Sequence, residues 1–315
     1  APRRAPRRPR RPGRRVVTTR AVTAARGEAL WATVADYVRL TKPRVISLLL
    51  VTTLCAMIAA AQGAPSGWDV LATMVGGYLA AGGANSVNQF VDRDIDARMG
   101  RTTGRPVVSG RITPARALVF GVACAAASVL TLGLAVNWVA SALAFAGFLL
   151  YVFLYTLWLK RSTVHNIVIG GAAGAVPPMV GWAAVTGDVG LAAWLLFAIV
   201  FYWTPPHFWA LALLLERDYA DAGVPMLPVV RGEQETRRQV LLWTLVCVGV
   251  SLLPYAAGTA GLVYLVSAAA LGALFLWYSA RLVKVADRAA AKVTFHYSML
   301  YLALLFAALV VDAVV

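Results

Sequence analysis

The chain has 315 residues, of which 60% are hydrophobic and 14% are charged. A soluble domain usually carries about 25% charged residues, so this composition is typical of a protein that is dissolved in a lipid bilayer. The formal net charge of +15 would also suit a nucleic-acid-binding protein. The positions of the basic residues argue against that class, and we expect no nucleic acid among the partners.

The N-terminal part of the chain differs in composition from the rest. It begins "APRRAPRRPRRPGRR" and has no acidic residue before Glu28. We expect residues 1–35 to be a disordered basic segment near anionic headgroups, and residues 36–315 to form one intramembrane domain. The stretch "WATVADYVRLTKPRV" predicts an amphipathic segment at the membrane interface before the first span.

Apolar segments of about 20 residues, the length that crosses a bilayer, follow one another through the rest of the chain. They predict an all-α fold: a polytopic membrane protein with nine transmembrane helices in a bundle and two acidic inner loops. The predicted spans are residues 44–61, 69–91, 116–136, 138–158, 165–185, 190–214, 240–258, 261–280 and 294–315.

The basic residues are confined to alternate connections. All 29 Lys and Arg lie within residues 1–44 or in the connections that follow spans two, four, six and eight. Positive charge gathers on the cytoplasmic side of membrane proteins. The pattern therefore predicts an integral cell-membrane protein with the N-terminus in the cytoplasm and the C-terminus outside, and this topology accounts for the net charge.

Two of the inner connections are long, residues 92–115 and 215–239. Each follows a span that is interrupted by Gly or Pro, and each opens with acidic residues. They are four spans apart, which indicates an internal duplication of a four-helix unit with a site at the shared interface.

The first long connection begins with polar residues at regular spacing. Asn88, Asp92 and Asp96 are spaced i, i+4 and i+8, which places them on one face of a helix. Two carboxylates and an amide oxygen at the aqueous edge of the membrane suit Mg²⁺, which completes its coordination with substrate phosphates and water. Arg101 and Arg105 follow and could bind diphosphate oxygens. The alternative is a solvated loop whose acids offset its arginines.

The second long connection carries Glu216, Asp218 and Asp221 where span six ends. Their spacing is less regular, although Asp218 and Asp221 can share a helix face. Two acidic clusters at one membrane depth, with basic residues around both, suggest more than one metal ion.

Four stretches in this sequence carry a resemblance to a known family. The first is similar to the Asn-xxx-Asp-xxx-Asp motif of the UbiA-type intramembrane prenyltransferases, and the others resemble the branch of that family that farnesylates heme. In chain order they are "NQFVDRDIDARMGRTTGRPVVSGRITP", "KRSTVHNIVIGGAAGAVPPMVGW", "YWTPPHFWALAL" and "DYADAGVPMLPVVRG". The resemblance covers about residues 36–315.

The resemblance implies a reaction and its partners. The farnesyl group of farnesyl diphosphate would be added to a vinyl group of heme B, with addition of water, to give heme O for terminal oxidase assembly. Mg²⁺ is the implied cofactor, and the bilayer holds both substrates. A downstream heme-modifying enzyme or an oxidase assembly factor is the implied protein partner.

The resemblance also implies roles for individual residues. Asn88, Asp92, Asp96 and Asp218 would hold metal ions on the diphosphate. The basic residues that would bind the diphosphate are Arg101, Arg105, Lys160 and Arg161. Asp221 joins the catalytic set, but the family's second Asp-xxx-Asp is absent because position 222 is Ala, which leaves the role of Asp221 open.

Aromatic and histidine residues are candidates for the acceptor site. A carbocation needs an apolar, aromatic wall that excludes water. Such a wall could come from spans four and six, although lipid-facing belts explain aromatic residues equally well. The candidates are Tyr151, Phe153, Tyr155, Trp158, Phe201, Tyr202, Trp203, Phe208 and Trp209.

Two of the histidines are expected to take part in heme binding. His207 follows Pro205 and Pro206 inside span six. It could contact the heme iron or a propionate, or it could cap carbonyls that the prolines leave free. His165, at the inner surface, is expected to contact a headgroup or a propionate.

Three alternative functions remain at this point. A prenyltransferase for a hydroxybenzoate or chlorin would resemble "DREDDxxxGxxS" in the second connection, where this chain has "ERDYADAGVPM". A transporter would carry its acids near the bilayer midplane, and here they lie at the inner surface. A heme-binding assembly partner without catalysis would need no diphosphate site.

Overall fold

The computed structural model describes the backbone of residues 19–315 and the side chains from residue 30 onward. Every regular element in this part of the chain is helical, which confirms the all-α prediction. The Arg/Pro-rich residues 1–18 lie outside the described part. The first helix begins at Thr19, so residues 19–35 of the predicted basic segment are helical in the structure.

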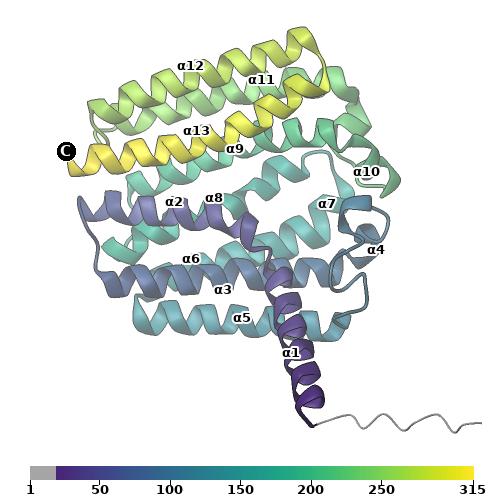
Figure 1. Ribbon diagram of the computed structural model, residues 1–315. Helices are drawn as coiled ribbons and strands as arrows, with labels where there is room; N and C mark the ends of the chain where they lie inside the picture. Colours follow the sequence, from purple (N-terminus) through teal and green to yellow (C-terminus); the bar gives the residue numbers. More distant parts are fainter. Residues whose placement is uncertain (1–18) are drawn as a thin grey trace, which may run out of the picture.

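The elements follow the predicted spans closely (Figure 1). Short helices α4, η1, α7 and α10 lie between the long ones, and η2 is a π-helical continuation of α6. The bounds are α1 (Thr19–Thr41), α2 (Pro43–Ala61), α3 (Gly67–Val91), α4 (Arg93–Asp96), η1 (Gly100–Thr102), α5 (Pro114–Ala135), α6 (Trp138–Leu149), η2 (Leu150–Leu159), α7 (Lys160–Ser162), α8 (Asn166–Thr186), α9 (Leu191–Leu214), α10 (Glu216–Asp221), α11 (Leu227–Ala256), α12 (Leu262–Val285) and α13 (Arg288–Val314).

Eight helices of the described chain are long and apolar enough to cross a membrane, with α6, η2 and α7 counted as one helix, Trp138–Ser162. Helix α3 is not among the eight. Its second half, "AAGGANSVNQFV", is rich in small and polar residues, although α3 packs along α5 and α2 like the others. The count of nine spans therefore stays a prediction.

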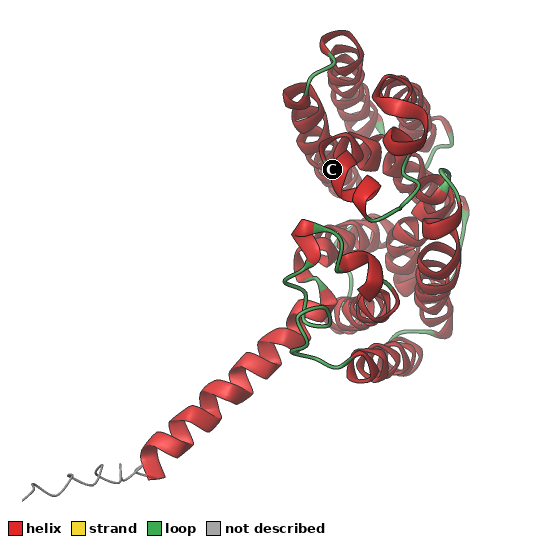
Figure 2. Ribbon diagram, turned by 90° about the vertical axis from the view of Figure 1, so that its right-hand side faces the viewer, coloured by secondary structure: helices red, strands yellow, loops and turns green. Residues whose placement is uncertain are grey.

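The long helices form a closed ring. Each contacts the next in chain order, and α13 closes the ring by packing against α2. Helix α8 also contacts α2, although the two helices are not neighbours in chain order. Figure 2 views most of these helices end-on, with α1 projecting away from the bundle.

Small residues let several helices approach closely. A Cβ atom built at Gly83 of α3 would lie 2.6 Å from the carbonyl oxygen of Gly121 in α5. One at Gly181 of α8 would lie 2.2 Å from the carbonyl oxygen of Thr53 in α2. Without a hydrophobic driving force between helices in lipid, such backbone approaches supply much of the packing energy.

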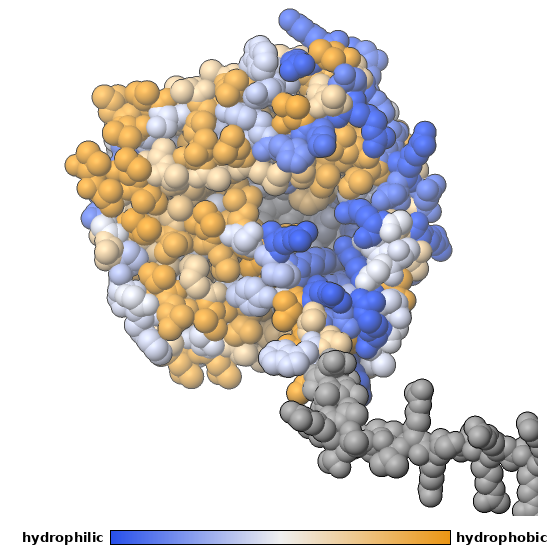
Figure 3. All heavy atoms as spheres, viewed as in Figure 1, coloured by the Kyte–Doolittle hydropathy of each residue, from blue (hydrophilic) through white to orange (hydrophobic). Residues whose placement is uncertain are grey.

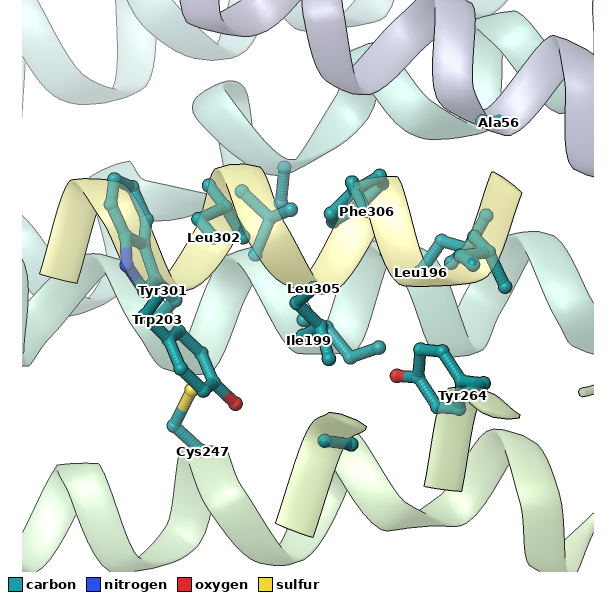
Figure 4. Packing of buried hydrophobic residues seen from close by; sticks show 14 of the residues in the cluster. Ala56, Leu196, Ile199, Trp203, Cys247, Tyr264, Tyr301, Leu302, Leu305 and Phe306 are labelled. Atoms are coloured by element: carbon teal, nitrogen blue, oxygen red, sulfur yellow. The ribbon is translucent and has the colours of Figure 1, made fainter. Parts of the chain in front are cut away.

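The largest buried apolar cluster lies between α2, α9, α11, α12 and α13 (Figure 4). Polar groups within it are paired: Trp203 Nε1 donates to the Ser298 carbonyl at 2.7 Å, and Tyr301 Oη lies 2.6 Å from Ser251 Oγ. Buried polar groups need such partners, so the C-terminal helices have a defined register against α9.

The polar residues gather at one end of the bundle. Figure 1 places α4, α7 and α10 at this end and the C-terminus at the other, and Figure 3 shows the hydrophilic side chains at the same end. The sides are apolar, with exposed residues such as Leu134 and Phe153. A belt of this kind suits lipid.

The second long connection is more structured than the sequence suggests. Residues 215–239 were expected to be a loop, but they contain α10 and the first part of α11. Helix α11 bends at Gly232, whose φ of 78° is accessible to glycine without strain. The expectation of a loop was wrong, because the charged residues there lie on helices that extend beyond the apolar region.

Candidate active site

The first acidic motif lies on a nearly continuous helical face at the end of α3. The Asp92 N–H donates to the Asn88 carbonyl and the Asp96 N–H to the Asp92 carbonyl, both at 2.8 Å. The i to i+4 hydrogen bonds thus pass through the junction between α3 and α4. Asn88, Asp92 and Asp96 share one face, as their spacing predicts.

These three side chains are expected at the aqueous edge of the membrane, and within the protein they are buried. Asn88, Asp92 and Asp96 are 3%, 0% and 2% exposed. Asp92 pairs with Lys160 and Asp96 with Arg105. Buried carboxylates are tolerated when charged partners and hydrogen bonds satisfy them. Lys160 comes from a segment 68 residues away from Asp92, whereas Arg105 lies nine residues after Asp96.

Lys42 is a site residue that the sequence analysis missed. It occupies the break between α1 and α2 with a left-handed φ of 56°, a conformation that costs a non-glycine residue about 1–2 kcal/mol. Its Nζ donates to Asn88 Oδ1 at 2.9 Å. Burial, together with repulsion from Arg105 and Lys160, lowers the pKa of Lys42 to about 7. The available signal was a lysine directly before the proline that starts span one.

Helix η2 also contributes unexpected partners to α3. Tyr151 Oη donates to Asn85 Oδ1 at 3.4 Å, and Asn88 Nδ2 donates to Thr156 Oγ1 at 3.2 Å. With the pair between Lys160 and Asp92, these bonds join the two helices along their inner ends. The π-helical turns are frequent at functional sites, and here they set which side chains face α3.

Arg161 lies at the outer rim of this site. It donates to Asp94 at 2.8 and 2.7 Å and approaches Asp92 at 3.5 Å. The Arg161 guanidinium lowers the pKa of Asp94 to about 2. The Asp94 side chain is 55% exposed, so it lies away from the buried face, as its spacing predicts.

Arg101 joins the two acidic segments. Its Nε lies 3.8 Å from Asp218 Oδ2, and its Nη2 donates to Tyr219 Oη at 3.2 Å. One apolar cluster lies beneath both segments and includes Ile95 and Met99 from the first and Tyr219 and Met226 from the second. Asp221, in contrast, is exposed at the end of α10.

The site offers oxygen ligands for one hard cation. Among the described side chains, no group of three or more His, Cys, Asp or Glu lies close enough to hold a metal ion. Asp218 is therefore not in one group with Asp92 and Asp96. A cation here would take oxygens from those two carboxylates and from Asn88, and would need further ligands from a phosphate or water. That is the donor set that Mg²⁺ prefers.

The structure separates the aromatic candidates into two groups. Phe153 and Trp158 are 58% and 63% exposed on the apolar side of the bundle, so they belong to the lipid-facing belt. Tyr151 and Tyr155 pack together, with ring centroids 5.5 Å apart, beside the acidic face. Phe208 and Tyr155 both pack on the cluster beneath the two acidic segments.

The two histidines lie in different surroundings. His165 is exposed just before α8. The His207 ring stacks between Trp203 and Phe295, with centroid distances of 4.2 and 4.9 Å, and its Nδ1 lies 2.8 Å from Ser298 Oγ. Because Nδ1 bonds to α13, it does not cap a carbonyl of its own helix.

Comparison with known proteins gives a consistent result. Residues 49–308 match the UbiA prenyltransferase family. A protein of Gloeobacter violaceus named protoheme IX farnesyltransferase is 51% identical over 286 residues, which cover 90% of this chain and 94% of that protein. One of the same name from Acidiphilium cryptum is 50% identical, with 91% and 93% covered.

Some relatives are much longer than this chain. The protoheme IX farnesyltransferase of Chloroflexus aurantiacus is 53% identical over 296 residues, which cover 94% of this chain but 50% of that protein. The chain therefore spans about half the length of this relative, and of others like it from Roseiflexus and Thermus thermophilus.

Solved structures share the fold. A digeranylgeranylglyceryl phosphate synthase superposes with a TM-score of 0.75 at 19% identity and covers 90% of this chain and 99% of its own. A UbiA homologue from Archaeoglobus fulgidus, solved with DMAPP and Mg²⁺, has a TM-score of 0.63 at 16% identity and covers 87% and 99%. The match over residues 49–308 and the relatives about 50% identical show that the chain belongs to the UbiA prenyltransferase family.

Proposed function

We propose that this protein transfers the farnesyl group of farnesyl diphosphate to a vinyl group of heme B, with addition of water, to form heme O. The observation that carries the proposal is the buried face of Asn88, Asp92 and Asp96, which is surrounded by basic side chains at one end of an apolar bundle. The names of relatives about 50% identical to this chain supply the acceptor.

The basic side chains bind the diphosphate. Arg105 and Lys160 lie directly on the acids, and Arg101 and Arg161 lie at the rim. Lys42 joins them from the break between α1 and α2. Guanidinium and ammonium groups stabilise negative charge that develops on a leaving group, and more strongly where water is excluded. These residues therefore favour cleavage of the C–O bond.

Magnesium fits the oxygen donors of Asn88, Asp92 and Asp96, and these residues would hold it against the diphosphate. When bound, it neutralises charge on the departing diphosphate. Asp218 would hold a second cation or, through its pair with Arg101, orient that arginine. Asp221 would act from the exposed end of α10.

The reaction balances without an oxidant. The bond between farnesyl C1 and the diphosphate oxygen breaks, and the electron pair leaves with the diphosphate. The vinyl π electrons then form the new C–C bond to C1, which leaves a cation on the carbon beside the pyrrole ring. Water adds there and loses a proton. Tyr151, Tyr155 and Phe208 would shield the first cation from water until the vinyl group reacts.

The heme-binding residues that we propose are His207, inside the bundle, and His165, at its inner end. His165 lies in the segment between Lys160 and α8, where a propionate could reach both the ring and the basic side chains. The bilayer supplies both substrates, and a heme-modifying enzyme or an oxidase assembly factor would receive the product. The polar end of the bundle would face the cytoplasm.

Mass spectrometry of the heme tests the proposal directly. Purified protein is incubated with heme B, farnesyl diphosphate and Mg²⁺, and the product should gain a farnesyl group and one water. Parallel reactions contain 4-hydroxybenzoate or a chlorin in place of heme. Transfer to one of those acceptors, with none to heme, would assign the protein to another prenyltransferase of this family.

A further inference from the structure

The hydrogen bonds around His207 fix the position of its proton. The Ser298 hydroxyl donates to the Phe295 carbonyl at 2.6 Å, and the same Ser298 oxygen lies 2.8 Å from His207 Nδ1. A hydroxyl has one proton to donate. That proton is directed to the carbonyl, so Nδ1 must carry the imidazole proton and donate it to Ser298 Oγ. Nε2 of the neutral ring then has a free lone pair and no proton.

The surroundings of the ring leave one edge open. Trp203 covers one face at an interplanar angle of 17° and Phe295 the other at 27°. Trp203 is itself held by the bond from its Nε1 to the Ser298 carbonyl at 2.7 Å. The His207 side chain is nevertheless partly exposed. With both faces covered and Nδ1 bonded, a ligand can reach the ring only at its Nε2 edge.

We propose that His207 binds the heme iron through Nε2 as an axial ligand; this rests on the proposed function, in which heme is the acceptor. A propionate would need an N–H donor at this edge, and a carbonyl freed by Pro205 or Pro206 would need one too. Iron needs a lone pair. An imidazole that binds a metal usually donates its other N–H to a second group, which is the arrangement of Nδ1 and Ser298.

The position of His207 sets how far the proposed iron site lies from the acidic site. The ring lies seven residues before the end of α9 at Leu214, or about 10 Å along the helix axis. Phe208 contacts the His207 ring edge-on at 5.7 Å and also belongs to the cluster beneath the two acidic segments. A macrocycle bound at His207 would extend along Phe208 toward the place where the farnesyl cation forms.

The other histidines do not offer the same arrangement. The chain has three. His165 is exposed before α8, and His296 is exposed on α13 with its Nδ1 2.7 Å from the Lys292 carbonyl. His207 alone lies inside the bundle. His296 has no part in the proposed site, which makes His296→Ala the matched control for His207→Ala.

The experiment measures heme binding without turnover. Ferric heme B is titrated into the purified wild-type protein and into the His207→Ala, His207→Gln and His296→Ala variants, and the Soret band is recorded. We expect a histidine-ligated spectrum in the wild type and in His296→Ala, and its loss in both His207 variants with heme affinity lower by about tenfold or more. Added imidazole should restore the spectrum in His207→Ala. His207→Gln nearly preserves the side-chain volume, so it carries the test if the alanine variant does not fold.

Two further probes distinguish binding of heme through its iron from binding through a propionate. Protoporphyrin IX keeps both propionates but lacks iron, so the wild type and His207→Gln should bind it equally. Heme B dimethyl ester keeps the iron but has no free propionate, so the difference between the two proteins should persist. Ser298→Ala should keep the ligand but lower the iron–nitrogen stretching frequency in the ferrous protein, because Nδ1 loses its acceptor.

The outcomes are distinct from those of the proposed function. An unchanged Soret band in both His207 variants would overturn the proposal. So would a loss of protoporphyrin IX affinity equal to the loss of heme affinity. If heme binds through His207 but no farnesylated product forms, the ligand assignment stands and the transferase function fails.

Discussion

The carboxylates at the end of α3 combine full burial with direct ion pairs. Asp92 is 0% exposed and pairs with Lys160, and Asp96 is 2% exposed and pairs with Arg105. Breaking such a pair from one side leaves an uncompensated buried charge, which costs about 3–5 kcal/mol. Asparagine also removes the charge, but it keeps the shape of the side chain and one acceptor oxygen, so it disturbs the packing less than truncation to alanine.

We expect Asp92→Asn to lower kcat by about 100-fold or more, because the site loses a negative charge and an oxygen that we propose to bind the metal. Asp94→Asn is the matched control: its side chain lies two residues away and is 55% exposed. It should keep activity within about threefold, as surface charges contribute little. The measurement is the rate of heme farnesylation, with thermal unfolding recorded for both variants. If both variants lose activity to a similar degree, the buried carboxylate has no role that the exposed one lacks.

Lys42 gives a second prediction at the residue scale. Lys42→Met keeps the stem of the side chain but removes the partly buried amino group that donates to Asn88. A hydrogen bond to a charged group contributes about 1.5–3 kcal/mol, so the KM for farnesyl diphosphate should rise by roughly tenfold or more. Arg44→Met, on the exposed face of the next turn, should leave KM unchanged. A normal KM in Lys42→Met would show that Lys42 only supports Asn88 in the fold.

Among the helices, α1 makes contacts that reach the segment after α4, in addition to preceding the first span. Asp36 of α1 is 6% exposed and accepts two bonds from Arg111 Nε, at 3.0 and 2.9 Å. Arg111 Nη2 donates in turn to the Gly104 carbonyl at 2.9 Å, next to Arg105. The helix that projects from the bundle in Figure 2 therefore holds the segment that carries Arg105, which we propose to bind the diphosphate.

This arrangement makes Asp36 a positioning residue. Asp36→Asn should raise the KM for farnesyl diphosphate by between about 10- and 100-fold, since small displacements of a binding group have effects of this size. The KM for heme should not change, and Asp36→Glu should recover most of the loss. Arg39→Ala is the matched control, because Arg39 contacts the same Asp36 oxygen at 3.0 Å from an exposed position. If Arg39→Ala and Asp36→Asn behave alike, the contact serves only α1.

At the scale of the whole molecule, charge and hydropathy separate along the bundle axis. The polar end holds both acidic segments, and the C-terminus lies at the opposite end (Figures 1 and 3). An odd number of crossings would give this arrangement if α1 lies at the inner surface. Positive charge on the inner connections predicts which end faces the cytoplasm.

Cysteine labelling in cells tests this topology. In a background without Cys55, Cys124 and Cys247, single cysteines at Ala64, Asp188 and Ala257 should react with a membrane-impermeant reagent from outside. Cysteines at Thr103 and Gln234 should react only after the cells are opened. All five positions are exposed and avoid the positive-φ glycines of the neighbouring turns, so labelling should not strain the backbone. One position that reacts from the wrong side would contradict the nine-span prediction.

The positions of the long helices could be predicted from the sequence, because the length of apolar segments and the segregation of Lys and Arg are local properties. It also placed Asn88, Asp92 and Asp96 on one face, since an i, i+4, i+8 spacing depends only on helix geometry. The helical start of α11 was missed, because a charged segment beyond an apolar one looks like a loop at the level of composition.

Which charges meet and which side chains are buried depends on the tertiary structure. Lys42 and Asn88 are 46 residues apart and Lys160 and Asp92 are 68 apart, and no local pattern encodes such pairings. The π-helical turns of η2 change which residues face α3, and the proton on His207 follows from a bond to a helix 91 residues away. Burial and protonation depend on neighbours that folding brings together, so they could be known only once the bundle was assembled.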